Sequence, residues 1–173
     1  MVQRINKILY TTDLSESAIT VFEQAVILAS QTGASIVLLH VIEDGSSGRI
    51  NRTVHLVNRE AYEQIRTQGL NMAKETLIGK RKTIPLIQHA LEELCAQTTG
   101  KVCHHDHPVA IDGIEVHYGN AADIITQVAD ASGCDLIVMG YHRKGSILKA
   151  LMGSSGKSVL AQSQKPVYLV PSP

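Results

Sequence analysis

No stretch of this chain approaches the roughly 20 consecutive apolar residues that a membrane-spanning helix needs, and its first residues hold no apolar run long enough for a signal peptide. Cysteine is scarce, with three residues in 173, at Cys95, Cys103 and Cys134. An odd, widely spaced set does not predict a disulfide framework and suits a reducing compartment. We therefore expect a cytoplasmic protein without a membrane partner.

An excess of either charge is also missing, because 16 basic side chains stand against 16 acidic ones. This balance argues against a broad nucleic-acid-binding surface. The eight histidines would add positive charge only in mildly acid conditions, since histidine titrates near a pH of about 6.5. We expect no nucleic-acid partner.

Two familiar phosphate-binding motifs are absent. Gly156-Lys157-Ser158 resembles the end of a P-loop, but Leu151 occupies the position of the first glycine, and no strand leads directly into the segment. No Gly-x-Gly-x-x-Gly follows the apolar run at residues 7–12. The sequence therefore excludes a P-loop NTPase and argues against a classical dinucleotide-binding fold.

Strand-like and helix-like segments alternate along the chain. Alternation of this kind predicts a parallel α/β sheet with right-handed crossovers. Helical spacing of apolar residues, with Ser15-Glu16-Ser17 and Asn120 as start signals, predicts three of the helices. The strands are predicted at residues 7–12, 34–42, 114–118, 136–139 and 166–170, and these helices at about 18–32, 121–132 and 154–162.

The middle of the chain is longer than a simple crossover requires. Residues 43–59 are polar and contain glycine and serine, which predicts a loop. Residues 60–95 are mostly helical in pattern, with expected breaks at Gly79 and Pro85 that leave either two helices or one kinked helix. We expect one domain over residues 1–173 with a long helical and loop insertion at about 44–112.

Ligands of open parallel sheets bind outside the carboxyl ends of the strands. The candidates there are Thr11, Thr12 and Asp13, then His40 and Val41, and finally the segment 139–155. In that last segment Gly140 follows an apolar strand, and Gly153-Ser154-Ser155 opens a predicted helix. Glycine allows close approach to a ligand, and a helix start attracts anions, so the segment predicts a phosphate site.

The chain resembles the universal stress protein family over nearly its whole length. Residues 7–15 resemble the opening strand and turn of that family, residues 38–42 its second strand, and residues 166–170 its last strand. The ATP-binding branch carries Gly, two residues, Gly, nine residues, Gly, then Ser or Thr. Gly140, Gly153 and Ser154 match this spacing, whereas Arg143 replaces the second glycine and Gly145 lies two residues further on.

For the fold we expect a single open five-stranded parallel sheet of the Rossmann-like, adenine nucleotide alpha hydrolase-like type. Helices cover both faces, and the strand order is 3-2-1-4-5. The resemblance also implies a homodimer formed by pairing of the last strands, for which residues 167–170 are sufficiently apolar.

The function implied is regulatory binding of an adenine nucleotide: ATP, with Mg²⁺, or AMP or cyclic AMP. No set of residues makes a convincing general base and nucleophile, so we expect slow ATP hydrolysis at most. The resemblance implies that Asp13 and the Val41 backbone contact adenine, while Gly140, Gly153, Ser154 and Ser155 face ribose and phosphates. The full predicted site is Thr11, Thr12, Asp13, Val41, Met139, Gly140, His142, Arg143, Gly145, Gly153, Ser154 and Ser155.

Arg143 leaves two outcomes open. Its side chain either blocks close approach of the loop, or its guanidinium binds a phosphate through charge-assisted hydrogen bonds. Purely structural roles are the alternatives elsewhere: Asp13 caps the first helix, Gly140 ends a strand, and His40 is a hydrogen-bonded core histidine. With those roles the protein is a nucleotide-independent stress or interaction dimer.

A third possibility is metal binding in the segment 103–107. Cys103, His104, His105 and His107 are potential ligands. Adjacent residues cannot all converge on one ion, so His89 or His117 would have to contribute. A solvated loop is the alternative interpretation of this composition.

Overall fold

The computed structural model describes residues 4–15, 17–43, 76–102, 108–142 and 154–172. The strands form one sheet in the order β3-β2-β1-β4-β5, and every pair is parallel. The predicted fold and strand order are therefore confirmed. The strands are β1 Lys7–Thr12, β2 Ser35–Ile42, β3 Ile111–Tyr118, β4 Leu136–His142 and β5 Val167–Ser172, and the helices are α1 Ala18–Thr32, α4 Thr76–Val102, α5 Ala121–Ala131 and α6 Ser154–Gln162.

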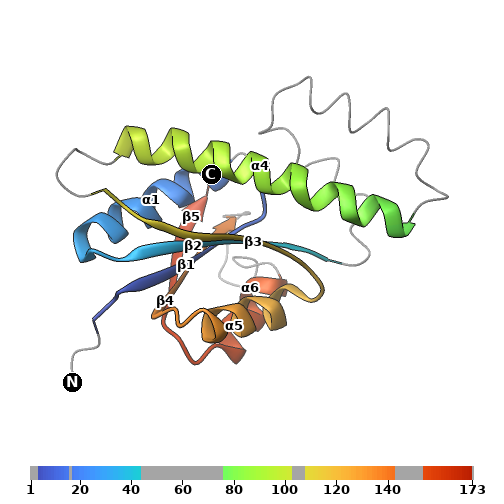
Figure 1. Ribbon diagram of the computed structural model, residues 1–173. Coiled ribbons are helices and arrows are strands. Elements are labelled where there is room, and N and C mark those ends of the chain that lie inside the picture. The colour runs from blue at the N-terminus through green and yellow to red at the C-terminus, as the bar shows by residue number, and fades with distance from the viewer. Residues whose placement is uncertain (1–3, 16, 44–75, 103–107, 143–153, 173) are drawn as a thin grey trace.

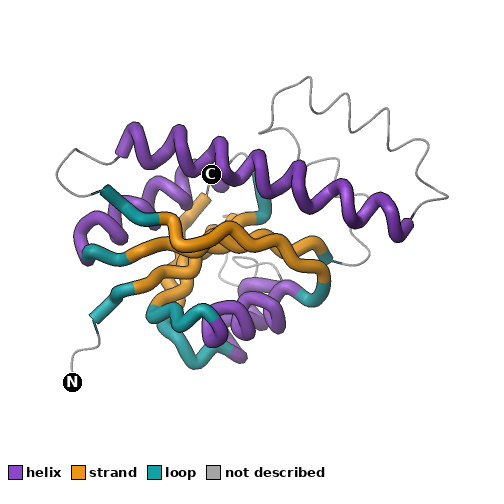
Figure 2. Tube along the Cα trace, viewed as in Figure 1, coloured by secondary structure: helices purple, strands orange, loops and turns teal. Residues whose placement is uncertain are grey.

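Helices cover both faces of the sheet, with α1 and α4 on one face and α5 and α6 on the other (Figures 1 and 2). Strand side chains alternate between the two layers. Tyr10 lies on the α1 side, where its ring stacks on Phe22 at 4.9 Å between centroids, whereas Leu9 lies in the opposite cluster. Burial on both faces explains why these strands read as continuous apolar runs.

Three strands are longer than the sequence predicts. β3 begins at Ile111, three residues early, and β5 reaches Ser172. The strand predicted to end at Met139 continues to His142, because Gly140 pairs with Val170 in β5. The expectation that Gly140 ends this strand is therefore wrong: partner pairing overrides the weak strand preference of glycine.

The middle helix also differs from the prediction. α4 is a single helix that runs through Pro85 and continues to Val102, past the helical pattern expected to reach residue 95. Proline removes one backbone donor, yet the following turns place Leu91 and Cys95 in the core against α1 and β3. Tertiary packing of this kind stabilises a helix that local preferences would interrupt.

The polar segment predicted as a loop at residues 43–59 lies, apart from Glu43, outside the described residues, so the bounds of the insertion stay a prediction. In the part of the chain that the structure describes, no helix is long and apolar enough to cross a membrane. Cys95 and Cys134 are free thiols buried on opposite faces of the sheet, and burial raises the pKa of each to about 11.

Candidate functional site

The carboxyl edge of the sheet has a step at its centre. β1 ends at Thr12, whose register partner in β2 is His40, while β2 continues to Ile42. On its other side β1 pairs with β4 only as far as Met139, and β4 continues to His142 alongside β5. The chain also reverses direction across the sheet between β1 and β4, which is the switch point where open α/β sheets bind ligands.

Thr11 and Thr12 lie at the floor of this step and are only 9% and 8% exposed. The Thr12 carbonyl oxygen accepts a hydrogen bond from His40 Nδ1 at 2.8 Å. Burial lowers the pKa of His40, against smaller opposite effects of this hydrogen bond and of the Asp13 charge. His40 is therefore a buried, hydrogen-bonded histidine, as in the structural alternative predicted for it, and burial favours its neutral form.

Asp13 opens a tight turn between β1 and α1. Its Oδ1 atom accepts a hydrogen bond from the Ser15 amide at 2.9 Å, and Thr12 Oγ1 accepts one from the Leu14 amide at 3.0 Å. Leu14 has a φ of 57°, so these two side chains stabilise a left-handed residue. The N-cap position of α1 belongs to Ser17, which makes no side-chain cap hydrogen bond, so Asp13 does not cap that helix.

Gly140 is required by packing whatever the ligand. A Cβ atom at this position would lie 2.9 Å from Val21 Cγ2, closer than side chains approach one another. Val21 is a buried residue of α1. The glycine therefore brings β4 close to α1 beside the step, which gives Gly140 a structural role in addition to the predicted nucleotide contact.

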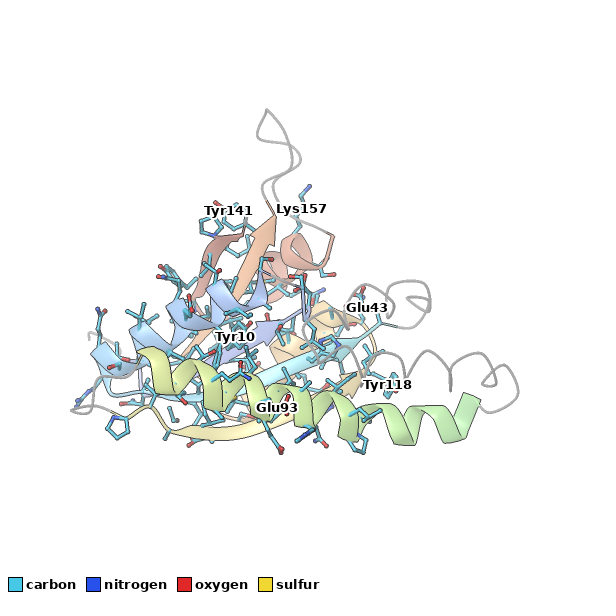
Figure 3. The ribbon with its side chains drawn as sticks, turned by 90° about the horizontal axis from the view of Figure 1, so that it is seen from above. Tyr10, Glu43, Glu93, Tyr118, Tyr141 and Lys157 are labelled. Carbon is cyan, nitrogen blue, oxygen red and sulfur yellow. The ribbon has the colours of Figure 1, made fainter. Side chains whose placement is uncertain are left out.

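Glu43 is a residue of this edge that sequence reasoning missed. It directly follows β2, and its Oε1 atom accepts hydrogen bonds from the Ser155 hydroxyl at 3.3 Å and the Ala121 amide at 3.4 Å. Figure 3 shows Glu43 at the end of β2. An acid directly after a parallel strand is a signal that could have identified it.

The described residues bring together six of the predicted positions: Thr11, Thr12, Asp13, Val41, Met139 and Gly140 come from the ends of β1, β2 and β4. Ser155 lies in the first turn of α6, and its hydroxyl donates to Glu43, the residue that directly follows β2. His142 ends β4 and Ser154 begins α6, and only their backbones are described. Arg143, Gly145 and Gly153 lie outside the described residues, so their roles stay predictions.

The suggested metal loop, Cys103, His104, His105 and His107, also lies outside the described ranges. The two histidines suggested as helpers have other partners. His117 Nε2 lies 2.8 Å from Glu115 Oε2 on β3, and His89 lies near two glutamates on α4. Among the described residues, no group of three or more potential ligands could hold a metal ion.

A cavity of about 300 Å³ lies at the opposite, amino edge of the sheet. Asn6, Gly33, Ser35, Pro108 and Ala110 are among its lining residues. None of the predicted nucleotide-binding positions contributes to it. It is therefore a feature separate from the step at the carboxyl edge.

The sheet order and this carboxyl-edge step define an open parallel α/β protein of the Rossmann-like class. The model of the universal stress protein family matches residues 4–171. The chain belongs to the universal stress protein family. It is 25% identical over 169 residues to Universal stress protein MJ0577 of Methanocaldococcus jannaschii, an alignment that covers 95% of this chain and 93% of that protein.

Solved structures of the family share the fold. The structure of MJ0577 superposes with a TM-score of 0.60 at 23% identity and covers 99% of both chains. A universal stress protein in complex with cAMP gives 0.58 at 15% identity, with 98% of each chain covered. UspA from Lactobacillus plantarum gives 0.55 at 20% identity, covering 97% of this chain and 99% of its own.

Proposed function

We propose that this protein is a regulatory module that binds an adenine nucleotide at the carboxyl-edge step. The observation that carries the proposal is the shape of the sheet edge: β2 and β4 both continue past the last residue of β1. The backbone at Val41 and the backbone at Gly140 therefore lie on either side of the end of β1. Open α/β sheets bind ligands at such a switch point.

Five of the predicted residues have a chemical role in this proposal. The Asp13 carboxylate and the Val41 backbone recognise the adenine edge through hydrogen bonds. The Gly140 backbone faces the ribose. The start of α6 at Ser154 and Ser155 supplies hydroxyl and amide donors for phosphate. Of these positions Asp13, Val41, Gly140 and Ser155 are fully described and lie at the same sheet edge.

The ligand class is supported by the family. One similar structure is a universal stress protein in complex with cAMP, an adenine nucleotide. For this chain we propose ATP, together with Mg²⁺, with AMP and cyclic AMP as further candidates. Binding rather than turnover is the proposed activity, and the buried histidine of this edge has a structural role: His40 Nδ1 donates to the Thr12 carbonyl.

We also propose that the protein is a homodimer that pairs through β5. This strand lies at the edge of the sheet, and Tyr168 on it is 44% exposed. An exposed edge strand with an apolar side chain offers a surface for strand pairing. Sedimentation equilibrium should give a dimer for the native chain and a weaker dimer for Tyr168→Lys; a native monomer at micromolar concentration would contradict dimerisation.

Equilibrium binding tests the nucleotide proposal. ATP, AMP and cyclic AMP are titrated into the purified protein, with and without Mg²⁺, and into Arg143→Gly. We expect at least one of them to bind more tightly than millimolar. Tighter nucleotide binding by Arg143→Gly than by the native chain would show that the arginine obstructs the loop. Weaker binding by the variant would show that the arginine binds phosphate. If neither form binds any of the three below millimolar concentration, the proposal is wrong.

A matched control uses the other end of the sheet. Asp112 is an exposed carboxylate that bonds Ser35 and Lys7 at the amino edge. Asp13→Asn and Asp112→Asn make the same chemical change at opposite edges. Only Asp13→Asn should weaken nucleotide binding; equal effects would place the ligand elsewhere.

A further inference from the structure

Glu43 completes the hydrogen bonding at the start of α5. The amides at the start of a helix lack carbonyl partners in a preceding turn, so they need other acceptors, of which the N-cap residue supplies some. Here Asn120 Oδ1 accepts from Ala122 at 3.0 Å and Asp123 at 3.2 Å, and the Asn120 carbonyl accepts from Ile124 at 3.0 Å. Ala121 donates to Glu43. All four amides at this helix start therefore have an acceptor within the protein.

The same carboxylate reaches α6. Its Oε1 atom is 3.3 Å from the hydroxyl of Ser155, in the first turn of that helix. Ser155 is one of the positions proposed to face the nucleotide phosphates. One oxygen of Glu43 thus accepts from a helix-start amide of α5 and from a hydroxyl of α6, which are donors of the kind that phosphate oxygens use.

The position of Glu43 is set by the backbone on either side. The Gly119 amide donates to the Ile42 carbonyl at 3.1 Å, which ties the end of β2 to the turn before α5. Gly119 has a φ of 146°, a conformation that favours glycine. Because Glu43 follows Ile42 directly, this link holds its side chain beside Ala121 and within reach of Ser155.

We propose that Glu43 disfavours phosphate at the Ser155 hydroxyl and so sets the charge of the nucleotide that this site accepts. The inference rests on the proposed nucleotide function. A phosphate oxygen bonded to Ser155 would lie within a few ångströms of the carboxylate, and like charges at that range repel. Binding of a phosphate-rich nucleotide then requires Glu43 to move away or a divalent cation to neutralise the repulsion.

Glu43→Gln separates charge from structure. Glutamine keeps a side-chain oxygen that can accept from Ala121 and Ser155, but it removes the negative charge. Glu115→Gln is the matched control: Glu115 lies on the same face of the sheet, and it bonds Ser132 at the far end of α5, at 3.5 Å. Urea unfolding of both variants checks that the fold is kept.

The affinities of adenosine, AMP, ADP and ATP are measured in EDTA at constant ionic strength for the native chain and both variants. We expect the affinity ratio of Glu43→Gln to native to rise with phosphate number, from about 1 for adenosine to on the order of tenfold for ATP. Glu115→Gln should give ratios near 1 throughout. With saturating Mg²⁺ the ratio for ATP should shrink.

Two outcomes overturn the inference. One is a ratio independent of phosphate number. The other is weaker ATP binding by Glu43→Gln only when Mg²⁺ is present, which would make the carboxylate a metal ligand. A separate arm follows the Ala121 and Ser155 amide resonances during titration with inorganic phosphate.

The phosphate arm distinguishes this inference from the nucleotide proposal. If neither form binds any nucleoside or nucleotide, the proposed function fails. The effect of Glu43 on phosphate then still stands if these resonances shift in Glu43→Gln and not in the native chain. If these resonances shift in neither the native chain nor Glu43→Gln, the inference about Glu43 fails together with the proposed function.

Discussion

The imidazole of His40 and the backbone of Thr12 form a hydrogen bond across two neighbouring strands, with 2.8 Å between Nδ1 and the carbonyl oxygen. The two residues are register partners of β2 and β1, and both side chains are at most 8% exposed. The bond holds a neutral histidine at the end of the strand that leads into Asp13. The carboxyl edge therefore contains a buried histidine whose pKa is lowered by burial.

His40 should make the protein less stable in mildly acid solution. Burial lowers its pKa in the folded state, so the unfolded chain takes up the proton first. The stability gained from neutral His40 is fully present above a pH of about 6.5 and is lost as the pH falls below that value. Urea unfolding at several pH values is compared for the native chain and His40→Gln.

The variant should lose about 1 to 2 kcal/mol at pH 7.5, because it disturbs a buried hydrogen bond. Its stability should then fall less steeply toward pH 5 than that of the native chain. The other seven histidines are common to both proteins, so the difference reports His40. Parallel stability curves would refute this role.

Gly140→Ala should destabilise the fold by about 1 to 3 kcal/mol, as overpacking does, because the new methyl group would lie 2.9 Å from Val21 Cγ2. Val21→Ala should restore part of the loss in the double variant. Gly113→Ala is the control, because a Cβ atom at Gly113 in β3 has nothing within 4 Å. Equal unfolding free energies for Gly140→Ala and Gly113→Ala would show that the contact is unimportant.

The start of α5 depends on the Asn120 side chain, which accepts from two helix amides. Asn120→Ala should cost about 1 kcal/mol, the usual effect of removing an N-cap. Asn120→Asp keeps the acceptor and adds a charge that suits a helix start, so it should retain native stability. Chemical denaturation measures both. An alanine variant as stable as the native chain would argue against the cap.

The thiols of Cys95 and Cys134 should react slowly with a disulfide reagent. They are 7% and 0% exposed, and burial raises their pKa values to about 11. Since the thiolate is the reactive form, little of it exists near pH 8. In Cys103→Ser, both remaining thiols should react at least about 100 times faster in denaturing urea than in buffer. Rapid labelling of the folded variant would contradict their burial.

The apolar spacing of nearby residues predicted the bounds of some elements correctly. The bounds of β1, Lys7–Thr12, and of α6, Ser154–Gln162, agree with the sequence prediction. The end of β4 was predicted too early because a glycine after an apolar run resembles the end of a strand. Pairing of Gly140 with Val170 in β5 extends β4 to His142. α4 was expected to break at Pro85, but packing against α1 and β3 keeps it continuous.

The candidate site divides in the same way. Thr12, Val41 and Gly140 could be assigned to one edge because parallel strands present their carboxyl ends together. The place of Glu43 directly after β2 could have assigned it to this edge, but its contacts could not be predicted, since they join residues 43, 121 and 155, which are far apart in the chain. Its position follows from how α5 and α6 pack on the sheet, which no local periodicity encodes.

Amide chemical-shift mapping with AMP is the most direct test of an adenine nucleotide at the carboxyl-edge step. We expect the largest shifts at Thr12, Val41, Gly140 and Ser155. The amide resonances of Ser35 and Ala110, which line the cavity at the amino edge, should not shift. The absence of shifts at millimolar AMP, or shifts concentrated at Ser35 and Ala110, would contradict nucleotide binding at the step.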